Sequence, residues 1–593
     1  MTVDALVDER TLREIYLSAF EYAVKEAQPW TVMCSYNKVN GTYASEHRYL
    51  LTEILRDEWG HEGLVVSDWG AVNQRVDALL AGLELEMPSS GGINDAKIVQ
   101  AVQEGKLPEM VLDTAVERIL KVVFQAIDQR VTDAVFAKEE HHRLARRVAS
   151  ESLVLLKNDE HLLPLPATCS IALIGAFAEQ PRYQGGGSSH VNPTKLETIK
   201  EELETLVSGS GQIHYAKGFT LEDDSSDDQL IAEAVQCARL GQTVVLCLGL
   251  PDAFESEGYD RTHLRLPDNQ LAILDAVTRI QNDVVVLLSA GSPVEMPWAE
   301  QVKSIVQCYL GGQAAGGAVA DVLMGVVNPS GRLAETYPVK LSDNPSYLNF
   351  PGEGDRVEYR EGIFVGYRYY EAKEVKPLFA FGHGLSYTEF QMSDLRVDKA
   401  AGSDTDTFTA TVDVTNRGSR PGQEVVQLYV APGACSVIRP PKELRAFAKV
   451  QLQPGETKTV SLHLDPRAFA YYSPDVKDWW VESGTYQILV GPASDKIVLT
   501  AAVQIQRSQE SRPHFHRNST LGDLLGSQDS RQAGLQMLQS LLQGMGMTVD
   551  AEAMEANPMM AMAKDFPLRG LVNFSGGAFT EDHLEAFLQQ VNR

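Results

Sequence analysis

The sequence predicts a multidomain protein that combines two α/β units, an all-β sandwich and a helical C-terminal tail. Strand and helix patterns alternate over residues 1–130 and again over 147–340, which is typical of parallel sheets covered by helices. Residues 389–507 change to short alternating strands separated by turn signals, which is typical of a β-sandwich. Residues 508–593 are helical in pattern and carry methionines at Met559, Met560 and Met562. A chain of 593 residues is long enough for three or four such domains.

The first α/β unit opens with Thr11-Leu-Arg-Glu14, a capping-box pattern that predicts a helix start. The apolar patterns that follow predict strands near 31–36, 64–68 and 83–87 and helices near 46–58, 72–80, 94–104 and 110–129. Parallel sheets carry their sites at the C-terminal ends of their strands, so we expect chemistry at the end of the strand that stops at Asp68.

A polar linker, 131–146, leads to the second unit, in which the strands are short and almost entirely apolar. They are predicted at 171–174, 243–248, 284–288 and 305–309, with helices between them. Residues 341–388 are rich in Gly, Pro and Tyr and are interpreted as a connector to the β-sandwich.

Charge and composition exclude several classes of partner. The net charge of -28 argues against nucleic acid and anionic membranes, which need basic patches, and favours a neutral small substrate. The sequence contains no run of eighteen or more apolar residues, so we expect no membrane-spanning helix. Six scattered cysteines without paired spacing predict reduced thiols rather than zinc or disulfides. Because the first residues carry acidic side chains and no signal-peptide core, we expect a cytoplasmic protein.

Asp68 is the first candidate catalytic residue. The apolar run Leu64-Val-Val-Ser ends at Asp68-Trp69, which places a carboxylate beside an indole, a pairing suited to sugar chemistry. Asp68 could act as the nucleophile of a glycosidase, or it could simply cap a helix that begins near Ala71.

A retaining glycosidase needs a second carboxylate about 5–5.5 Å from the first. The candidates are Glu255 and Glu257, in a charged loop after the strand at 243–248. Crowding of carboxylates there would raise the pKa of one, which suits a general acid. The alternatives are a solvated acidic loop for the two glutamates and a structural ion pair for Asp260-Arg261.

Three further features have structural interpretations. Gly185-Gly-Gly-Ser-Ser-His190 lacks the ending of a phosphate-binding loop, so an ordered inter-domain loop is favoured over nucleotide binding. Trp479-Trp480 could form a sugar platform, although core or strand-edge packing is the preferred interpretation. Glu84 is interpreted as structural.

Long motifs give the chain a resemblance to glycoside hydrolase family 3, the β-glucosidase family. They are VDERTLREIYL, FEYAVKEA, VMCSYNKVNG, LLTEILRDEWG, GLVVSDWGAV, ESEGYDR, NPSGRLAETYP, VGYRYYE, FGHGLSYTEF and FSGGAF. The resemblance runs through nearly the whole chain. It implies a TIM-like barrel, an α/β sandwich and a fibronectin type III-like domain.

The resemblance also implies roles for five residues. The nucleophile would be Asp68 and the acid/base Glu257, while Met33, Tyr36 and Trp69 would line the sugar pocket. The implied reaction is exo-acting, retaining hydrolysis of terminal β-D-glucosyl residues from an oligosaccharide or an aryl or alkyl glycoside by double displacement, with no cofactor or metal.

The resemblance begins part-way through the family's barrel. A complete eight-unit barrel takes about 200–250 residues, whereas residues 1–130 suffice for about three strand-helix units. We therefore expect an N-terminally truncated barrel with an exposed sheet edge, self-association through that edge, and sugar binding weakened enough to place activity in doubt. The alternative functions are a β-xylosidase or α-arabinofuranosidase of the same family, or a catalytically inactive remnant; a β-N-acetylhexosaminidase is disfavoured.

Overall fold

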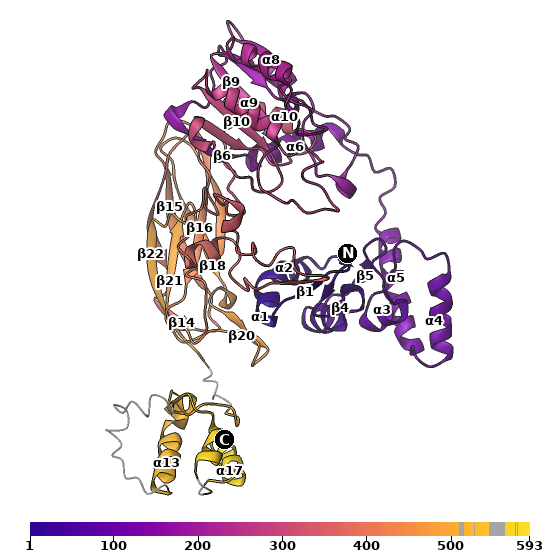
Figure 1. Cartoon of the computed structure of the whole chain (residues 1–593), viewed down its shortest axis with the longest axis vertical. Coiled ribbons are helices and arrows are strands. Elements are labelled where there is room, and N and C mark those ends of the chain that lie inside the picture. Colours follow the sequence, from indigo (N-terminus) through magenta and orange to yellow (C-terminus); the bar gives the residue numbers. More distant parts are fainter. Residues whose placement is uncertain (509–514, 527, 545–563, 576, 578, 593) are drawn as a thin grey trace. The chain divides into compact units, whose positions relative to one another are not determined.

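The computed structural model describes residues 1–508, 515–526, 528–544, 564–575, 577 and 579–592, and Figure 1 shows the chain coloured along its sequence. It divides into two compact units, Met1–Gln506 and Arg507–Arg593. Within the first unit the α/β regions and the β-sandwich follow one another in the predicted order.

The first region contains a partial parallel barrel, as predicted. Strand β2 (Thr31–Cys34) pairs in parallel with β5 (Leu64–Ser67), and Val66 of β5 forms a parallel bridge to Leu85. The predicted helices are observed as η3 (Tyr49–Glu58, with π-helical bonding), α3 (Arg75–Ala81), α4 (Ile93–Gln103) and α5 (Glu109–Asp128). Helix α5 leaves several apolar side chains exposed, among them Val116, Leu120, Val123, Phe124 and Ile127.

The start of this region differs from the prediction. The predicted capping box that starts at Thr11 is not formed. The Asp8 carboxylate caps α1 (Glu9–Thr11) instead, by accepting from the Thr11 N–H at 2.9 Å. Glu14 instead accepts from the side chain of Arg10. Helical structure continues through η1 (Leu12–Tyr16) and α2 (Ser18–Ala27).

A small unpredicted sheet ties the chain start to the connector. Strand β1 (Asp4–Leu6) lies between β12 (Arg356–Glu358) and β3 (Lys38–Val39), and β3 pairs with β4 (Thr42–Tyr43). Residues some 350 positions apart in sequence are therefore hydrogen-bonded neighbours.

The second region is an α/β sandwich with the strand order β6-β11-β10-β9-β7-β8. Four strands match the predicted ones: β7 (Ser170–Ile174), β9 (Thr243–Gly249), β10 (Val284–Ser289) and β11 (Ser304–Gln307). The edge strands, β6 (Val154–Asn158) and β8 (Gln212–Ala216), were not predicted. Helices pack on the sheet: α6 (Lys138–Ser152), α7 (Ile199–Leu206), α8 (Asp228–Ala238), α9 (Asp268–Thr278) and α10 (Ala315–Leu323).

The third region is a β-sandwich, as predicted. One sheet has the order β13-β15-β18 and the other β14-β22-β21-β16-β17. Their bounds are β13 (Phe390–Val397), β14 (Ala401–Ser403), β15 (Phe408–Asn416), β16 (Gly422–Ala431), β17 (Glu443–Leu452), β18 (Thr457–Leu464), β21 (Gly484–Gly491) and β22 (Leu499–Gln506). Alternating inward side chains of both sheets form its core.

A short hairpin and one helix complete this unit. The hairpin joins β19 (Tyr471–Ser473) to β20 (Asp478–Trp480), and α11 (Tyr367–Ala372) lies in the connector.

The second unit is helical where it is described, as predicted for the tail. It contains α12 (Leu521–Gly526), α13 (Gln528–Gly544), α16 (Leu568–Phe574) and α17 (Glu581–Val591), which share a small apolar core. Met559, Met560 and Met562 lie outside the described residues. No helix in the described parts of the chain has the length and apolar character needed to cross a membrane.

Candidate active site

Asp68 lies at the C-terminal edge of the partial barrel, as predicted. The parallel register aligns Cys34 with Ser67, so that Tyr36 and Asp68 follow neighbouring strands at the same edge. The Tyr36 hydroxyl donates to Asp68 Oδ1 at 2.9 Å, and the Trp69 N–H donates to the same oxygen at 2.6 Å. The alternative role of Asp68 as a helix cap is wrong, because α3 begins only at Arg75.

Two of the predicted pocket residues expose apolar surface near this carboxylate. Trp69 follows Asp68 directly, and its side chain is 64% exposed. Met33 lies on β2, opposite Val66 of β5, and is 59% exposed. Exposed aromatic and thioether groups beside a carboxylate provide an apolar surface against which a sugar ring can pack.

Glu257 reaches the same place from the α/β sandwich. It lies on the exposed loop that follows β9, and its Oε2 accepts from the Ser188 N–H at 2.8 Å. The negative charge of Asp68 acts on the Glu257 carboxyl. Both carboxylates act on the Tyr36 hydroxyl, and the hydrogen bond from this hydroxyl to Asp68 raises the pKa of Tyr36. The fold therefore brings Asp68, Tyr36 and Glu257 together, although more than 180 residues separate the two carboxylates in sequence.

The predicted electrostatics of the acid/base are wrong for Glu257. The Ser188 side chain and then its main-chain N–H lower the pKa of Glu257 by hydrogen bonding, and the opposing effects of desolvation and of Asp68 are smaller. Raised carboxyl pKa values are found instead at Glu335, where partial desolvation and the negative Glu255 raise the pKa to about 7 although the residue keeps an exposed surface, and at Glu371. An exposed carboxylate that accepts a main-chain N–H is stabilised in its charged form.

Glu255 and Arg261 fix the loop that carries Glu257. Glu255 accepts from the Gly291 N–H at 2.8 Å and from the Ser292 hydroxyl. Arg261 Nη1 donates to Ser292 Oγ at 2.8 Å and to the Pro293 carbonyl at 3.0 Å. Glu255 is therefore not a solvated acidic side chain, and the predicted pairing of Arg261 with its neighbour in sequence is replaced by contacts with the loop after β10.

Arg182 is a site residue that the sequence analysis missed. Its side chain is buried, pairs with Asp252, and donates to the Glu255 carbonyl at 2.8 Å. A lone arginine in an irregular segment gives no local pattern that could have identified it. The following segment, Gly185–His190, was interpreted as an inter-domain loop, yet its Ser188 contacts Glu257.

Glu84 and Trp479 have the structural roles that were predicted. Glu84 is buried and accepts from Arg56 at 2.8 and 2.9 Å and from Arg118 at 2.8 Å. Trp479 packs against Tyr472, and the Arg467 guanidinium lies 3.1 Å from its ring centre.

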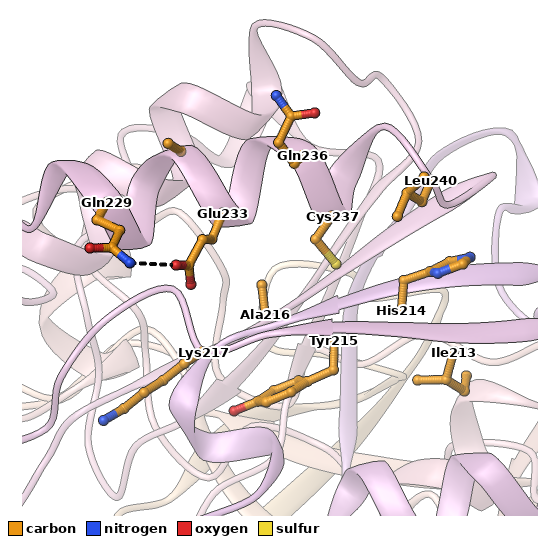
Figure 2. Close-up of a pocket in the computed structure, with 11 residues that line it drawn as sticks. Ile213, His214, Tyr215, Ala216, Lys217, Gln229, Glu233, Gln236, Cys237 and Leu240 are labelled. Carbon is orange, nitrogen blue, oxygen red and sulfur yellow. Dashed lines mark hydrogen bonds between the residues drawn. The ribbon is translucent and has the colours of Figure 1, made fainter.

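A separate cavity of about 740 Å³ lies between the edge strand β8 and helix α8 (Figure 2). Gln229 donates to Glu233 at 2.9 Å on its helical wall. Neither Asp68 nor Glu257 lines this cavity, so it is distinct from the candidate active site. Among the described residues, no cluster of three or more His, Cys, Asp or Glu side chains could hold a metal ion.

Three parts of the chain match known domain families. Residues 2–122 match the glycosyl hydrolase family 3 N terminal domain, residues 153–387 the glycosyl hydrolase family 3 C-terminal domain, and residues 424–494 a fibronectin type III-like domain. Asp68 falls in the first of these and Glu257 in the second.

Curated relatives and solved structures agree with these matches. The chain is 54% identical to thermostable beta-glucosidase B of Acetivibrio thermocellus over 593 residues, which are 100% of the chain and 78% of the relative. It is 45% identical to an exo-alpha-(1->6)-L-arabinopyranosidase of Bifidobacterium longum, over 86% of the chain and 68% of that protein. The crystal structure of a Bifidobacterium adolescentis GH3 beta-glucosidase superposes with a TM-score of 0.84 at 43% identity, covering 91% of this chain and 78% of that one.

Proposed function

Because this chain belongs to glycosyl hydrolase family 3, we propose that it is a retaining, exo-acting β-glucosidase that releases terminal β-D-glucosyl residues. The observation that supports the proposal is that Tyr36 donates to Asp68 and that the charge of Glu257 acts on both residues. Substrates would be small oligosaccharides or aryl and alkyl β-glucosides.

In the first step Asp68 attacks the anomeric carbon while Glu257 protonates the departing glycosidic oxygen. Tyr36 and Trp69 both donate to Asp68 Oδ1, so we assign Oδ2 as the attacking oxygen. The product is a glucosyl ester of Asp68, and the aglycone leaves as an alcohol or phenol. Met33 and Trp69 would line the sugar pocket beside this ester.

In the second step Glu257 accepts a proton from water, and the water oxygen attacks the anomeric carbon. The bond to Asp68 breaks, and glucose leaves with its β-configuration retained. Asp68 is neutral as an ester, so its charge no longer raises the pKa of Glu257. The remaining hydrogen bond from Ser188 then favours the ionised carboxylate, which is the form a general base requires.

A second candidate follows from the arabinopyranosidase relative, which is 45% identical over 86% of the chain. The β-xylosidase and α-arabinofuranosidase alternatives drawn from the sequence also stay open to test. A catalytically inactive remnant is the third possibility to be tested.

The test is release of nitrophenol by the purified chain from a panel of nitrophenyl glycosides: β-D-glucoside, β-D-xyloside, α-L-arabinofuranoside and α-L-arabinopyranoside. We expect the highest kcat/KM on the β-D-glucoside and its loss in Asp68→Asn. Preference for an arabinoside or xyloside would replace the substrate assignment. Absence of hydrolysis from folded protein would show that the chain is inactive.

We also propose the domain limits of the chain, its cellular location and its oligomeric state. The domains are 1–130 for the barrel part, 147–340 for the α/β sandwich, 389–507 for the β-sandwich and 508–593 for the helical tail, with 131–146 and 341–388 as linker and connector. Six free cysteines, five of them buried, support a reducing cytoplasmic location. The edge of β2 that does not pair with β5 supports self-association as a homo-oligomer.

A further inference from the structure

The glycine-rich segment Gly185–Ser189 lies against the tip of the loop that carries Glu257. Ser188 of this segment donates a hydrogen bond to Glu257. At two glycines of the segment, atoms of the loop lie too close to leave room for a side chain. A Cβ on Gly187 would lie 2.7 Å from Glu257 Cβ and 2.8 Å from its Oε2. A Cβ on Gly186 would lie 2.5 Å from Ser256 Oγ and 2.7 Å from its Cβ.

The backbone at Gly187 adds a second requirement for glycine. Its φ is +81°, in the left-handed region that residues with a side chain rarely adopt. Gly187 therefore allows both the turn and the close approach that aim the Ser188 N–H at the Glu257 carboxylate. A main-chain donor cannot rotate away as a side-chain donor can, so the position of the carboxylate is set by the backbone.

The acid/base loop is also held from other sides. Arg182, just before the glycine segment, pairs with Asp252 and donates to the Glu255 carbonyl. The Glu255 side chain accepts from Gly291 and Ser292 in the loop after β10. These contacts restrain the residues before Glu257, while Ser188 contacts the reacting carboxylate itself.

We propose that Gly186, Gly187 and Ser188 are positioning residues that hold the Glu257 carboxylate in place for the general-base step. This proposal rests on the proposed function, because it takes Glu257 as the acid/base. The segment does not touch the sugar in this role. It acts through Glu257, by fixing the oxygen that accepts the proton of the attacking water.

Gly187→Ala tests the proposal, and Gly185→Ala is the matched control. A Cβ on Gly185 would meet only the flexible side chain of Ser189, at 2.8 Å, and not the acid/base loop. The substrate is 2,4-dinitrophenyl β-D-glucoside, whose phenol leaves without protonation, so that kcat reports hydrolysis of the glycosyl-enzyme. Because displacement of a catalytic group by about 1 Å can cost about 100-fold in rate, we expect a loss of that order in Gly187→Ala and none in Gly185→Ala.

Azide separates a positioning role from a structural one. It attacks the anomeric carbon as an anion and displaces the Asp68 carboxylate without any general base, giving β-glucosyl azide. We expect azide to restore turnover in Gly187→Ala and to leave the wild type unchanged. An unchanged kcat in Gly187→Ala, or a loss that azide does not restore, would overturn the proposal.

Amide hydrogen exchange gives a second measurement that does not depend on turnover or on the folding of Gly187→Ala. In the wild type the Ser188 amide should be protected by Glu257, and Glu257→Ala should speed its exchange by about tenfold or more. Equal exchange in both proteins overturns the proposal. If the wild type releases no dinitrophenol the proposed function fails, and this exchange result alone decides whether the segment holds Glu257.

Discussion

Glu443→Gln should destabilise the β-sandwich strongly. Glu443 begins β17, is 4% exposed, and contacts three guanidinium groups. Arg445 lies 2.6 Å away, and Arg439 and Arg368 each lie 3.3 Å away. Burial by itself raises the pKa of Glu443, but the three arginines outweigh it and lower the pKa to about 2. The substitution removes the charge and leaves three arginines crowded together.

Two independent arguments give the size of the effect. Lowering a carboxyl pKa from 4.5 to about 2 corresponds to about 3 kcal/mol of folding stability at neutral pH. Breaking a buried ion pair by removing one partner costs about 3–5 kcal/mol in other proteins. We therefore expect a loss of about 3 kcal/mol, which shifts a urea midpoint by about 1–3 M for a domain of this size.

The assay is urea unfolding followed by tryptophan fluorescence, with Glu389→Gln as the control at an exposed site of the same domain. A depressed carboxyl pKa stabilises the fold above pH 4.5, and this contribution is lost as the pH falls toward 2. The difference between wild type and Glu443→Gln should thus be constant above pH 5 and shrink below pH 4.5. A midpoint shift no larger than that of the control, or one independent of pH, would show that the three arginines do not stabilise the ionised Glu443 carboxylate.

Two other substitutions have defined outcomes. Glu84→Gln removes the partner of two arginines in the barrel region and should cost about 3–5 kcal/mol in urea unfolding, whereas a loss under 1 kcal/mol would contradict its structural role. Tyr36→Phe removes a donor to Asp68 and should lower kcat more than it changes KM in steady-state assays; an unchanged kcat would exclude a role for this hydrogen bond.

The sequence was sufficient for the regular parts of the fold. Apolar strand patterns located β5, β9, β10 and β11 to within about two residues, because buried parallel strands need continuous apolar runs. The two edge strands of the α/β sheet were missed. Strand β8 is only partly buried at Ile213, His214 and Tyr215. A partly buried strand can mix polar with apolar residues, and such a run lacks the continuous apolar pattern that located the inner strands.

The candidate site was predicted only in part. Asp68 follows a strong strand pattern, and the family motifs identified Glu257. The contact that lowers the pKa of Glu257 comes from Ser188, far away in sequence, while Arg182 contacts the Glu255 carbonyl of the same loop. No local pattern encodes a main-chain N–H aimed at a distant carboxylate. Charge crowding predicted a raised pKa for one carboxyl of this loop without saying which, and Glu257 is not that carboxyl.

The most direct test of the central proposal, that Asp68 is the nucleophile of a retaining glucosidase, is covalent trapping. The chain would be incubated with 2,4-dinitrophenyl 2-deoxy-2-fluoro-β-D-glucoside, and the intact protein and its peptides would be analysed by mass spectrometry. We expect one fluoroglucosyl group per chain, attached to Asp68, and no label in Asp68→Asn. A label on another residue, or none on folded protein that hydrolyses aryl glucosides, would contradict it.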